Sequence, residues 1–258
     1  SLKGDSDLGS KVRGNYYWGL SRITGVDRRL YADDKAVRGT VVEQGSLGDC
    51  YFLAGLTGLA DAKPDAIKKM ITENQDGTYT VRFPGRKPVT VTAPTDAEIS
   101  RYVSSGRNGI WLNVLEKAYA KSRNDSRLFA KGDMYKAIEG GWGRQSIKAL
   151  TGNASDVSRM RFLSTASLQA KVTQAQADGR LMTIATGHHF SRSETKANKL
   201  PTGHEYTVMG YDESSGKYRI RNPWGSGGTQ GDGMLELTAA EVKANFATLT
   251  VEKRKPSR

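Results

Sequence analysis

The sequence predicts an α+β fold of two lobes, a largely helical lobe followed by a largely β lobe. Between residues 50 and 122, apolar side chains recur at helical spacing. After residue 180, short runs with strand character follow one another and are separated by turn residues. Segregated helices and strands favour two packed lobes, and the groove between such lobes is where a site is expected. The 258 residues are long enough to bury a core without disulfides.

The helical lobe is assigned to residues 39–152, after a lead-in of residues 1–38 that is expected to be flexible in part. Leu53, Leu56 and Ala60 form one stripe, which predicts a buried helix beginning at Cys50. The next elements are a helix over residues 64–74 with Pro in its first turn, a hairpin of 78–83 with 89–93, an amphipathic helix over 111–122, and a glycine-rich break at 140–143.

The β lobe is assigned to residues 153–252. It is expected to begin with a helix from about residue 167 to 178, which Gly179 ends. Five strands are then predicted, over residues 181–186, 204–211, 217–222, 234–237 and 247–251. Residues 253–258 form a basic tail, for which a solvated state is expected.

Charge and hydropathy exclude several classes of protein. The chain has 39 Lys and Arg against 27 Asp and Glu, but this net charge of +12 is spread along the sequence and forms no concentrated stripe. No specific nucleic-acid partner is therefore expected. No run of 18 apolar residues exists and the first residues lack a signal peptide, so neither a membrane partner nor a secretory signal is predicted. The localisation is undetermined, and the missing initiator Met suggests a soluble domain of a longer or secreted protein.

Cys50 is the sole cysteine and lies where a glycine-containing loop leads into a helix. The positive end of a helix favours a thiolate, which is the nucleophilic form of the side chain. Unpaired N–H groups at the same helix end can also bind an oxyanion, and the side-chain amide of Gln44 could be a second donor. A buried, unreactive Cys is the alternative interpretation of this position.

A reactive thiol needs a base, and the base needs a partner that fixes its tautomer. His204 begins a predicted strand, and Asn222 ends the next one. Because adjacent antiparallel strands bring these positions together, the Asn amide could hold the imidazole. Taken singly, His204 is better explained as a partly buried structural residue and Asn222 as a turn former before Pro.

Three segments taken together resemble the calpain family of papain-like cysteine proteases: QGSLGDCYFLA at residues 44–54, GHEYTV at 203–208 and RNPWG at 221–225. The resemblance covers about residues 39–252 and implies the two-lobed papain-like fold with its active site in the cleft. It implies a cysteine-type, calpain-like endopeptidase that hydrolyses peptide bonds through an acyl-thioester. One departure is Tyr51, where the family usually has Trp.

The resemblance also implies a role for each matching residue. Cys50 is the expected nucleophile, His204 the general base and then acid, and Asn222 the residue that orients the imidazole. Gln44 and the backbone N–H of Cys50 are the expected oxyanion hole.

Four further positions have supporting roles by the same resemblance. Trp224 is expected to shield the bond between His204 and Asn222 from water. Three glycines are expected to pair with an extended substrate through their backbone, namely Gly203, Gly141 and Gly152.

The chemistry requires no cofactor, and no metal site is predicted. No C-x-x-C or H-E-x-x-H spacing exists, and His188 and His189 are interpreted as loop residues. The family's loop after RNPWG contributes calcium ligands, but residues 226–233 contain one carboxylate, Asp232. Calcium dependence of the calpain kind is therefore not expected.

The expected partner is a protein or peptide substrate, with self-cleavage of the polar N-terminal segment as one case. Two alternatives stay open from sequence. Deamidation or transamidation of a protein side chain would use the same acyl-thioester, and a noncatalytic interaction module would use none of this chemistry.

Overall fold

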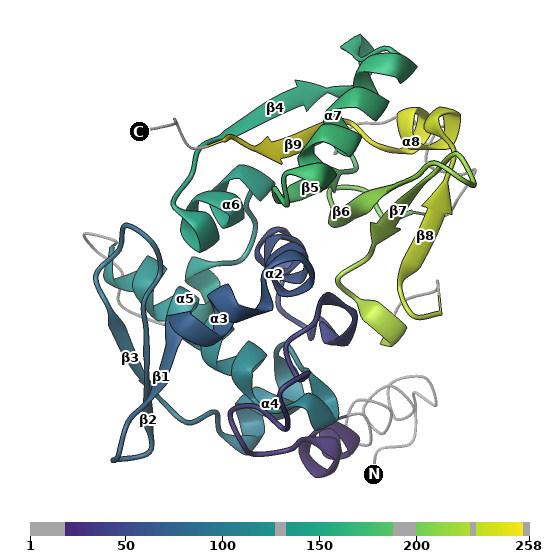
Figure 1. The fold of residues 1–258 in the computed structure, drawn as a ribbon. Coiled ribbons are helices and arrows are strands. Elements are labelled where there is room, and N and C mark those ends of the chain that lie inside the picture. Colours follow the sequence, from purple (N-terminus) through teal and green to yellow (C-terminus); the bar gives the residue numbers. More distant parts are fainter. Residues whose placement is uncertain (1–18, 127–132, 188–199, 228–230, 255–258) are drawn as a thin grey trace, which may run out of the picture.

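The fold is known from a computed structural model, which describes residues 19–126, 133–187, 200–227 and 231–254. Figure 1 shows a helical lobe, built around α2 and α5, beside a lobe built on a twisted sheet. The predicted α+β class is confirmed. His188 and His189 lie outside the described residues.

Besides the helical residues 19–25, the helical lobe contains helices α2 to α6 and a small antiparallel sheet with strand order β1-β2-β3 within the described ranges. The helices are α2 (Cys50–Ala62), α3 (Pro64–Met70), α4 (Asp96–Arg101), α5 (Trp111–Asp125) and α6 (Gly143–Thr151). The strands are β1 (Ile71–Glu73), β2 (Thr78–Val81) and β3 (Val89–Thr92), and short 3₁₀ helices occur at Gly39–Val41, Gly106–Asn108 and Met134–Ala137.

The second lobe is an antiparallel sheet with strand order β4-β9-β5-β6-β7-β8. Its strands are β4 (Ser155–Arg159), β5 (Met182–Ala185), β6 (Glu205–Asp212), β7 (Lys217–Arg221), β8 (Met234–Leu237) and β9 (Thr248–Glu252). Its helices are α7 (Thr165–Ala177) and α8 (Ala239–Asn245), with 3₁₀ turns at Met160–Phe162 and Gly225–Gly227. The described ranges thus contain all five predicted strands and one more, β4.

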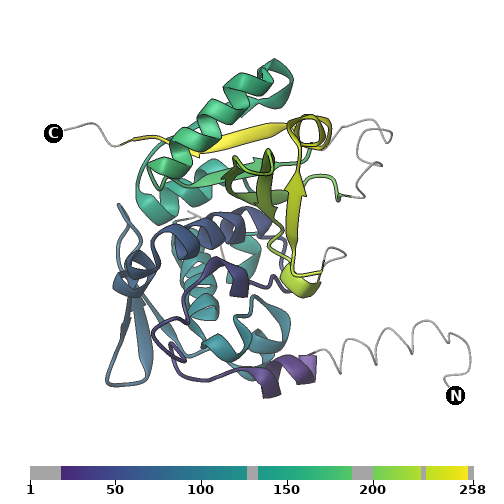
Figure 2. The same ribbon diagram turned by 45° about the vertical axis from the view of Figure 1, so that its right-hand side comes forward.

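Helices cover both faces of the large sheet, and Figure 2 shows α7 lying across its strands. Because side chains alternate along a strand, Ile184 and Tyr206 pack with Leu168 of α7 in one apolar cluster. The opposite face meets the helical lobe, where the Thr207 hydroxyl donates to the Ala54 carbonyl of α2 at 2.6 Å. The nucleophile-bearing helix is therefore packed directly against β6.

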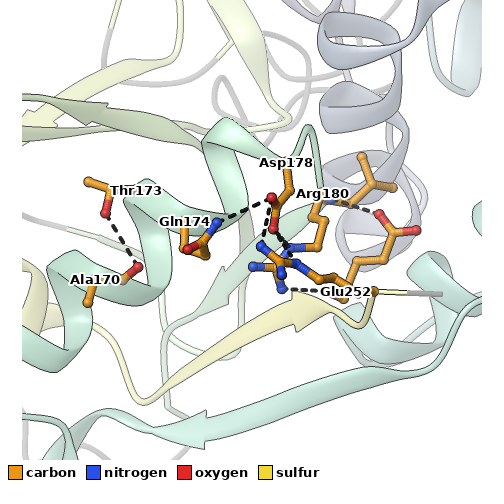
Figure 3. Close-up of polar contacts among 8 residues, drawn as sticks. Ala170, Thr173, Gln174, Asp178, Arg180 and Glu252 are labelled. Atoms are coloured by element: carbon orange, nitrogen blue, oxygen red, sulfur yellow. Dashed lines mark hydrogen bonds and ion pairs between the residues drawn. The ribbon is translucent and has the colours of Figure 1, made fainter. Parts of the chain in front are cut away.

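The C-terminal end of α7 is joined to β9 by a small charged cluster (Figure 3). Asp178 accepts from Gln174 at 3.2 Å and pairs with Arg180 at 2.9 Å. Arg180 in turn donates to the backbone carbonyl of Glu252 at 3.1 Å. Arg254 of the basic tail also pairs with Asp178, although its side chain is largely exposed. These bonds fix the end of α7 against the last strand of the sheet.

One predicted segment differs in the structure. The helix expected over residues 64–74 ends at Met70, because residues 71–73 form β1 and pair with β2. The β-branched Ile71 and Thr72 favour that strand. Residues 19–38, part of the segment assigned as a lead-in, pack against the helical lobe, where Leu30 and Val37 are buried. The elements α4, α6, β4 and α8 were not predicted, although α4 and α8 begin with a capping box that the sequence shows, Thr95 with Glu98 and Thr238 with Glu241.

Candidate active site

Cys50 is the first residue of α2 and is half-buried at the junction of the two lobes. The loop before it is held on both sides. The Ser46 N–H donates to the Arg101 carbonyl at 2.8 Å within the helical lobe, and the Gln44 N–H donates to the Pro223 carbonyl at 2.8 Å across to the β lobe. This loop therefore places the thiol where the two lobes meet.

His204 and Asn222 form a buried hydrogen bond, with 2.8 Å between Nε2 of the ring and Oδ1 of the amide. His204 immediately precedes β6 and Asn222 immediately follows β7, so the pairing of these strands brings them together. The backbone N–H of Trp224 also donates to Oδ1, at 3.0 Å. Because Oδ1 accepts both bonds, Nε2 carries the proton and Nδ1 is the unprotonated ring nitrogen.

Two aromatic rings enclose the imidazole. The Trp224 ring lies 4.6 Å from the His204 ring, centroid to centroid, and Tyr206 contacts it edge-on at 4.9 Å. Both contacts exclude water from the histidine and fix the plane of its ring. Trp224 therefore packs directly against the imidazole that is bonded to Asn222.

Burial decides the protonation of the thiol and the imidazole. It raises the pKa of Cys50 to about 11, and nearby Asp49 and Glu205 add to this rise. Backbone hydrogen bonds from Glu205 and Tyr51 oppose the rise only in part, so the preference of a helix N-terminus for thiolate is outweighed. Burial also lowers the pKa of His204 to about 4, against the opposing bond to Asn222. At neutral pH both groups are uncharged.

Gln44 lies in the loop before Cys50, and its side-chain nitrogen donates to the Leu47 carbonyl at 2.6 Å. The same nitrogen is 3.5 Å from a carboxylate oxygen of Asp49. The amide nitrogen thus uses one N–H in a short bond to Leu47 and the other in a long, weak bond to Asp49.

The three candidate glycines occupy different places. Gly141 packs against the ring of Tyr51, the neighbour of Cys50, and Gly203 directly precedes His204 with a positive φ of 64°. Both are therefore beside the cleft. Gly152 is instead the C-cap of α6, in the left-handed conformation with φ of 74°. That conformation alone explains a glycine there, at the opposite end of α6 from Gly141.

Two buried carboxyl groups behind the nucleophile were missed by sequence analysis. Asp49 and Glu116 are fully buried and hydrogen-bonded to each other. Burial raises the pKa of Asp49 to about 7 and that of Glu116 well above its usual range. Glu116 therefore stays protonated, and its O–H donates a hydrogen bond to Asp49. The oxygens of Glu116 accept the Val103 N–H at 3.2 Å. A charged residue inside the apolar helix 111–122 was the available signal.

Glu205 is a third buried acid, directly after His204. Burial raises its pKa to about 7, and the neighbouring Thr183 and Gly143 oppose that rise only in part. Its oxygen Oε1 is buried without a hydrogen-bond partner. Sequence analysis treated this residue only as part of a motif, although a carboxyl group beside a catalytic-type histidine was visible there.

Comparison with known proteins identifies the family. The sequence profile of the calpain family of cysteine proteases matches residues 13–236, which is most of the chain.

The chain belongs to the calpain family of cysteine proteases.

This calpain-family chain is similar to curated relatives from animals, plants and bacteria. It is 29% identical to the calpain-2 catalytic subunit of Rattus norvegicus over 85% of its length, and 31% identical to a thiol protease of Porphyromonas gingivalis over 75%. It is also 28% identical to a calpain-type cysteine protease of Oryza sativa subsp. japonica over 73% of its length. These matches span 33% of the length of the Rattus norvegicus protein, 46% of the Porphyromonas gingivalis protein and 9% of the Oryza sativa protein. The resemblance inferred from the three motifs is thereby confirmed.

Across the part of the chain that the structure describes, no group of three or more His, Cys, Asp or Glu side chains is placed to hold an ion. Asp232 is the sole carboxylate in the loop after RNPWG, and its Oδ1 accepts the Met234 N–H at 3.0 Å. Likewise, no helix in the described ranges is long and apolar enough to cross a membrane.

Proposed function

We propose that this chain is a calpain-like cysteine endopeptidase whose catalytic residues are Cys50, His204 and Asn222. The observation that supports this most is the buried hydrogen bond of 2.8 Å between His204 Nε2 and Asn222 Oδ1. It leaves Nδ1 as the ring's proton acceptor, in a lobe that packs directly on the helix beginning at Cys50. A nucleophile, a base and an orienting amide are the parts that acyl transfer requires.

In the proposed reaction, His204 Nδ1 removes the proton of the Cys50 thiol as Sγ attacks the carbonyl carbon of the scissile peptide bond. The tetrahedral intermediate collapses when the imidazolium gives that proton to the departing amine, leaving an acyl-thioester. Water then attacks the thioester, His204 accepts one of its protons, and that proton returns to the thiol as the carboxylic acid leaves. Since both groups are neutral at rest, proton transfer accompanies the attack.

The oxyanion of each intermediate would be bound by the Cys50 backbone N–H and by the Gln44 side-chain N–H that now makes the long 3.5 Å bond to Asp49, which the oxyanion would replace. The first of these groups lies at the start of α2, where helix N–H groups have no partner within the helix. The bond from Gln44 to Leu47 holds the amide in place before substrate arrives. Donors that are already oriented need no reorganisation during the reaction.

We further propose that turnover is independent of calcium and needs no cofactor, because the described carboxylates form no cation site. The substrate would be an extended polypeptide, with Gly203 and Gly141 as backbone partners and the chain's own N-terminal segment as one candidate. Gly152 is less suited to this part because it closes α6.

The test is the intact mass of the protein after incubation with a peptidyl epoxide, with calcium and with a chelator. Because Cys50 is the sole cysteine, the modified residue is known in advance. One adduct per chain in both conditions, and none in Cys50→Ala, is the expected result, together with cleavage of a denatured protein by the wild type only.

Other outcomes are equally informative. An adduct only with calcium would contradict calcium independence. A thiol that reacts with iodoacetamide but not with the epoxide, in a protein that cleaves no polypeptide, would contradict the protease proposal. Ammonia release from a glutamine-containing protein without chain cleavage would then favour the deamidase, and no reaction at all would favour the noncatalytic module.

A further inference from the structure

A small cavity of about 130 Å³ lies beside the candidate active site and is used by none of the steps above. It is bounded by the N-terminus of α6 on one side and by β4, β6 and β9 on the other. Binding sites for whole drug-sized ligands measure about 300–1,000 Å³. This cavity has room for a single side chain.

Both walls of the cavity are tied to the catalytic residues. Glu205, in one wall, directly follows His204, and its backbone N–H helps to stabilise the Cys50 thiolate. Trp142, in the other, directly follows Gly141, which packs on the ring next to Cys50. A substrate residue near the scissile bond therefore passes the opening of this cavity.

The lining combines apolar groups with one buried acid. Trp142 and Val157 are about half exposed, 51% and 48%, whereas Glu205 is only 5% exposed. Thr248 and Thr250 add their side chains from β9. A lysine or arginine has the matching shape, since its apolar stem can lie along such walls while its charged end reaches an acid at the base.

The carboxyl group of Glu205 is not neutralised by the chain itself. Among the described residues it forms no ion pair, and Oε1 has no hydrogen-bond partner. Arg144 also lines the cavity, but its guanidinium lies over the Trp142 ring, 5.9 Å from the ring centre, and no ion pair between it and Glu205 is present among the described residues. A buried carboxyl group without a counter-ion gains from a cation that enters beside it.

The N-terminus of α6 approaches Glu205 closely at Gly143. A Cβ on Gly143 would lie 2.4 Å from Glu205 Oε1 and 2.0 Å from Thr183 Oγ1, so only glycine lets the helix come this near to the acid. The neighbouring helix thus holds the carboxyl group in place while leaving the cavity open.

We propose that this cavity receives a lysine or arginine side chain of the substrate, and that Glu205 is the residue that selects it. The inference rests on the proposed protease function, because it assigns the substrate class of that same cleft. Glu205 acts on specificity and takes no part in the bond-breaking steps.

The first experiment measures cleavage of a peptide library in which lysine is exchanged for norleucine, its uncharged analogue, at each position. At one position near the scissile bond, the wild type should prefer lysine by about tenfold or more in kcat/KM, as expected for a buried charge pair. Glu205→Gln should remove that preference and leave norleucine peptides cleaved. Glu236→Gln, an exposed carboxyl of β8, is the matched control and should behave as the wild type.

The second experiment needs no turnover. Five-residue alanine peptides with a central lysine or norleucine are tested for protection of Cys50 against iodoacetamide, followed by intact mass. Comparing the two peptides within one variant cancels any direct effect of Glu205 on thiol reactivity. Lysine should protect at about tenfold lower concentration in the wild type, and the two should be equal in Glu205→Gln.

A pH series separates selection from a structural role. Glu205 is charged above its pKa of about 7, so the lysine-to-norleucine ratio should be larger at pH 8.5 than at pH 6. Cys50, with a pKa of about 11, and His204, with a pKa of about 4, stay uncharged over this range, so neither they nor the Arg144 guanidinium change the ratio with pH. Glu205→Gln should show no such change.

The results distinguish the two proposals. Efficient cleavage without any lysine or arginine preference, or the same preference in Glu205→Gln, would overturn this inference. Neither result would affect the proposed protease function. Absence of both cleavage and epoxide labelling would overturn the proposed protease function. In that case, equal protection of Cys50 by the lysine and norleucine peptides in the wild type would still contradict the proposed role of the cavity.

Discussion

The bond between His204 and Asn222 determines how the imidazole works. Asn222→Ala removes the acceptor that fixes the ring, and a hydrogen bond to a group that becomes charged contributes about 1.5–3 kcal/mol. We expect kcat/KM to fall by about 10- to 150-fold, less than in Cys50→Ala or His204→Ala, which should abolish turnover. Steady-state kinetics together with circular dichroism test this. Turnover equal to wild type would remove Asn222 from the site.

The same histidine predicts a pH dependence. Burial lowers the pKa of His204 to about 4, so the neutral ring, which is the active base, persists down to that pH. We expect the acidic limb of kcat/KM to lie near pH 4. Asn222→Asp puts a carboxylate beside the ring and should shift that limb to higher pH. A limb near pH 6.5 in the wild type, with no shift in the variant, would contradict this environment.

The pair of Asp49 and Glu116 should make stability fall as the pH rises. An unfolded Asp loses its proton near pH 4, whereas the pKa of folded Asp49 is about 7. Between these values the folded chain holds more protons, so its free energy of unfolding decreases with pH.

Glu116→Gln should flatten this dependence, because its amide donates permanently to Asp49 and still accepts from Val103. A gain of about 1 kcal/mol at pH 8 would raise Tm by about 2–4 °C. Thermal unfolding from pH 5 to 8, with Glu236→Gln as the control, is the measurement. A variant that loses stability at pH 8 would mean that Glu116 is ionised in the folded protein.

At the scale of elements, the loop before α2 depends on one glycine. A Cβ on Gly45 would lie 2.3 Å from the carbonyl oxygens of Arg101 and Tyr102, which belong to backbone that cannot easily move. Gly45→Ala should therefore displace the loop that carries Gln44 and leads to Cys50.

Overpacking of this kind costs about 1–3 kcal/mol, and we expect kcat/KM to fall as well because the candidate oxyanion donors shift. Gly48→Ala is the matched control in the same loop, since a Cβ there meets nothing within 4 Å. Chemical denaturation and kinetics of both variants test the prediction. Equal effects of the two substitutions would show that the loop is insensitive to this contact.

At the scale of the whole molecule, Arg221 joins the two lobes. This fully buried guanidinium at the end of β7 donates to the carbonyls of Val42 at 3.1 Å and Thr40 at 2.7 Å in the helical lobe. Arg221→Met leaves both carbonyls without a donor, at about 1–3 kcal/mol each. We expect Tm to fall by about 5 °C or more.

The same substitution should reduce kcat/KM, because Asn222 and Trp224 follow Arg221 directly and the cleft is formed between the lobes. Arg219→Met, an exposed position of the same strand, is the control and should change Tm by less than about 2 °C. Equal Tm values for the two variants would show that the lobes are held together without Arg221.

Local sequence was enough to predict the fold class, α2, the hairpin and the five strands, because hydrophobic periodicity and turn residues act over a few positions. It also indicated the pairing of His204 with Asn222, since a strand, a short turn and a second strand leave their outer ends adjacent. The end of α3 was placed wrongly because pairing with β2, a tertiary contact, outweighed local helix propensity at Ile71.

Only the tertiary structure decided the electrostatics of the cleft. Asp49, Glu116 and Glu205 look in sequence like ordinary acids, and Cys50 looks like a thiol activated by a helix end. Burial reverses those expectations, because the cost of a charge depends on what the rest of the chain packs around it. The sequence by itself determined which residues are available to the site, and packing determined their protonation and the cavity beside them.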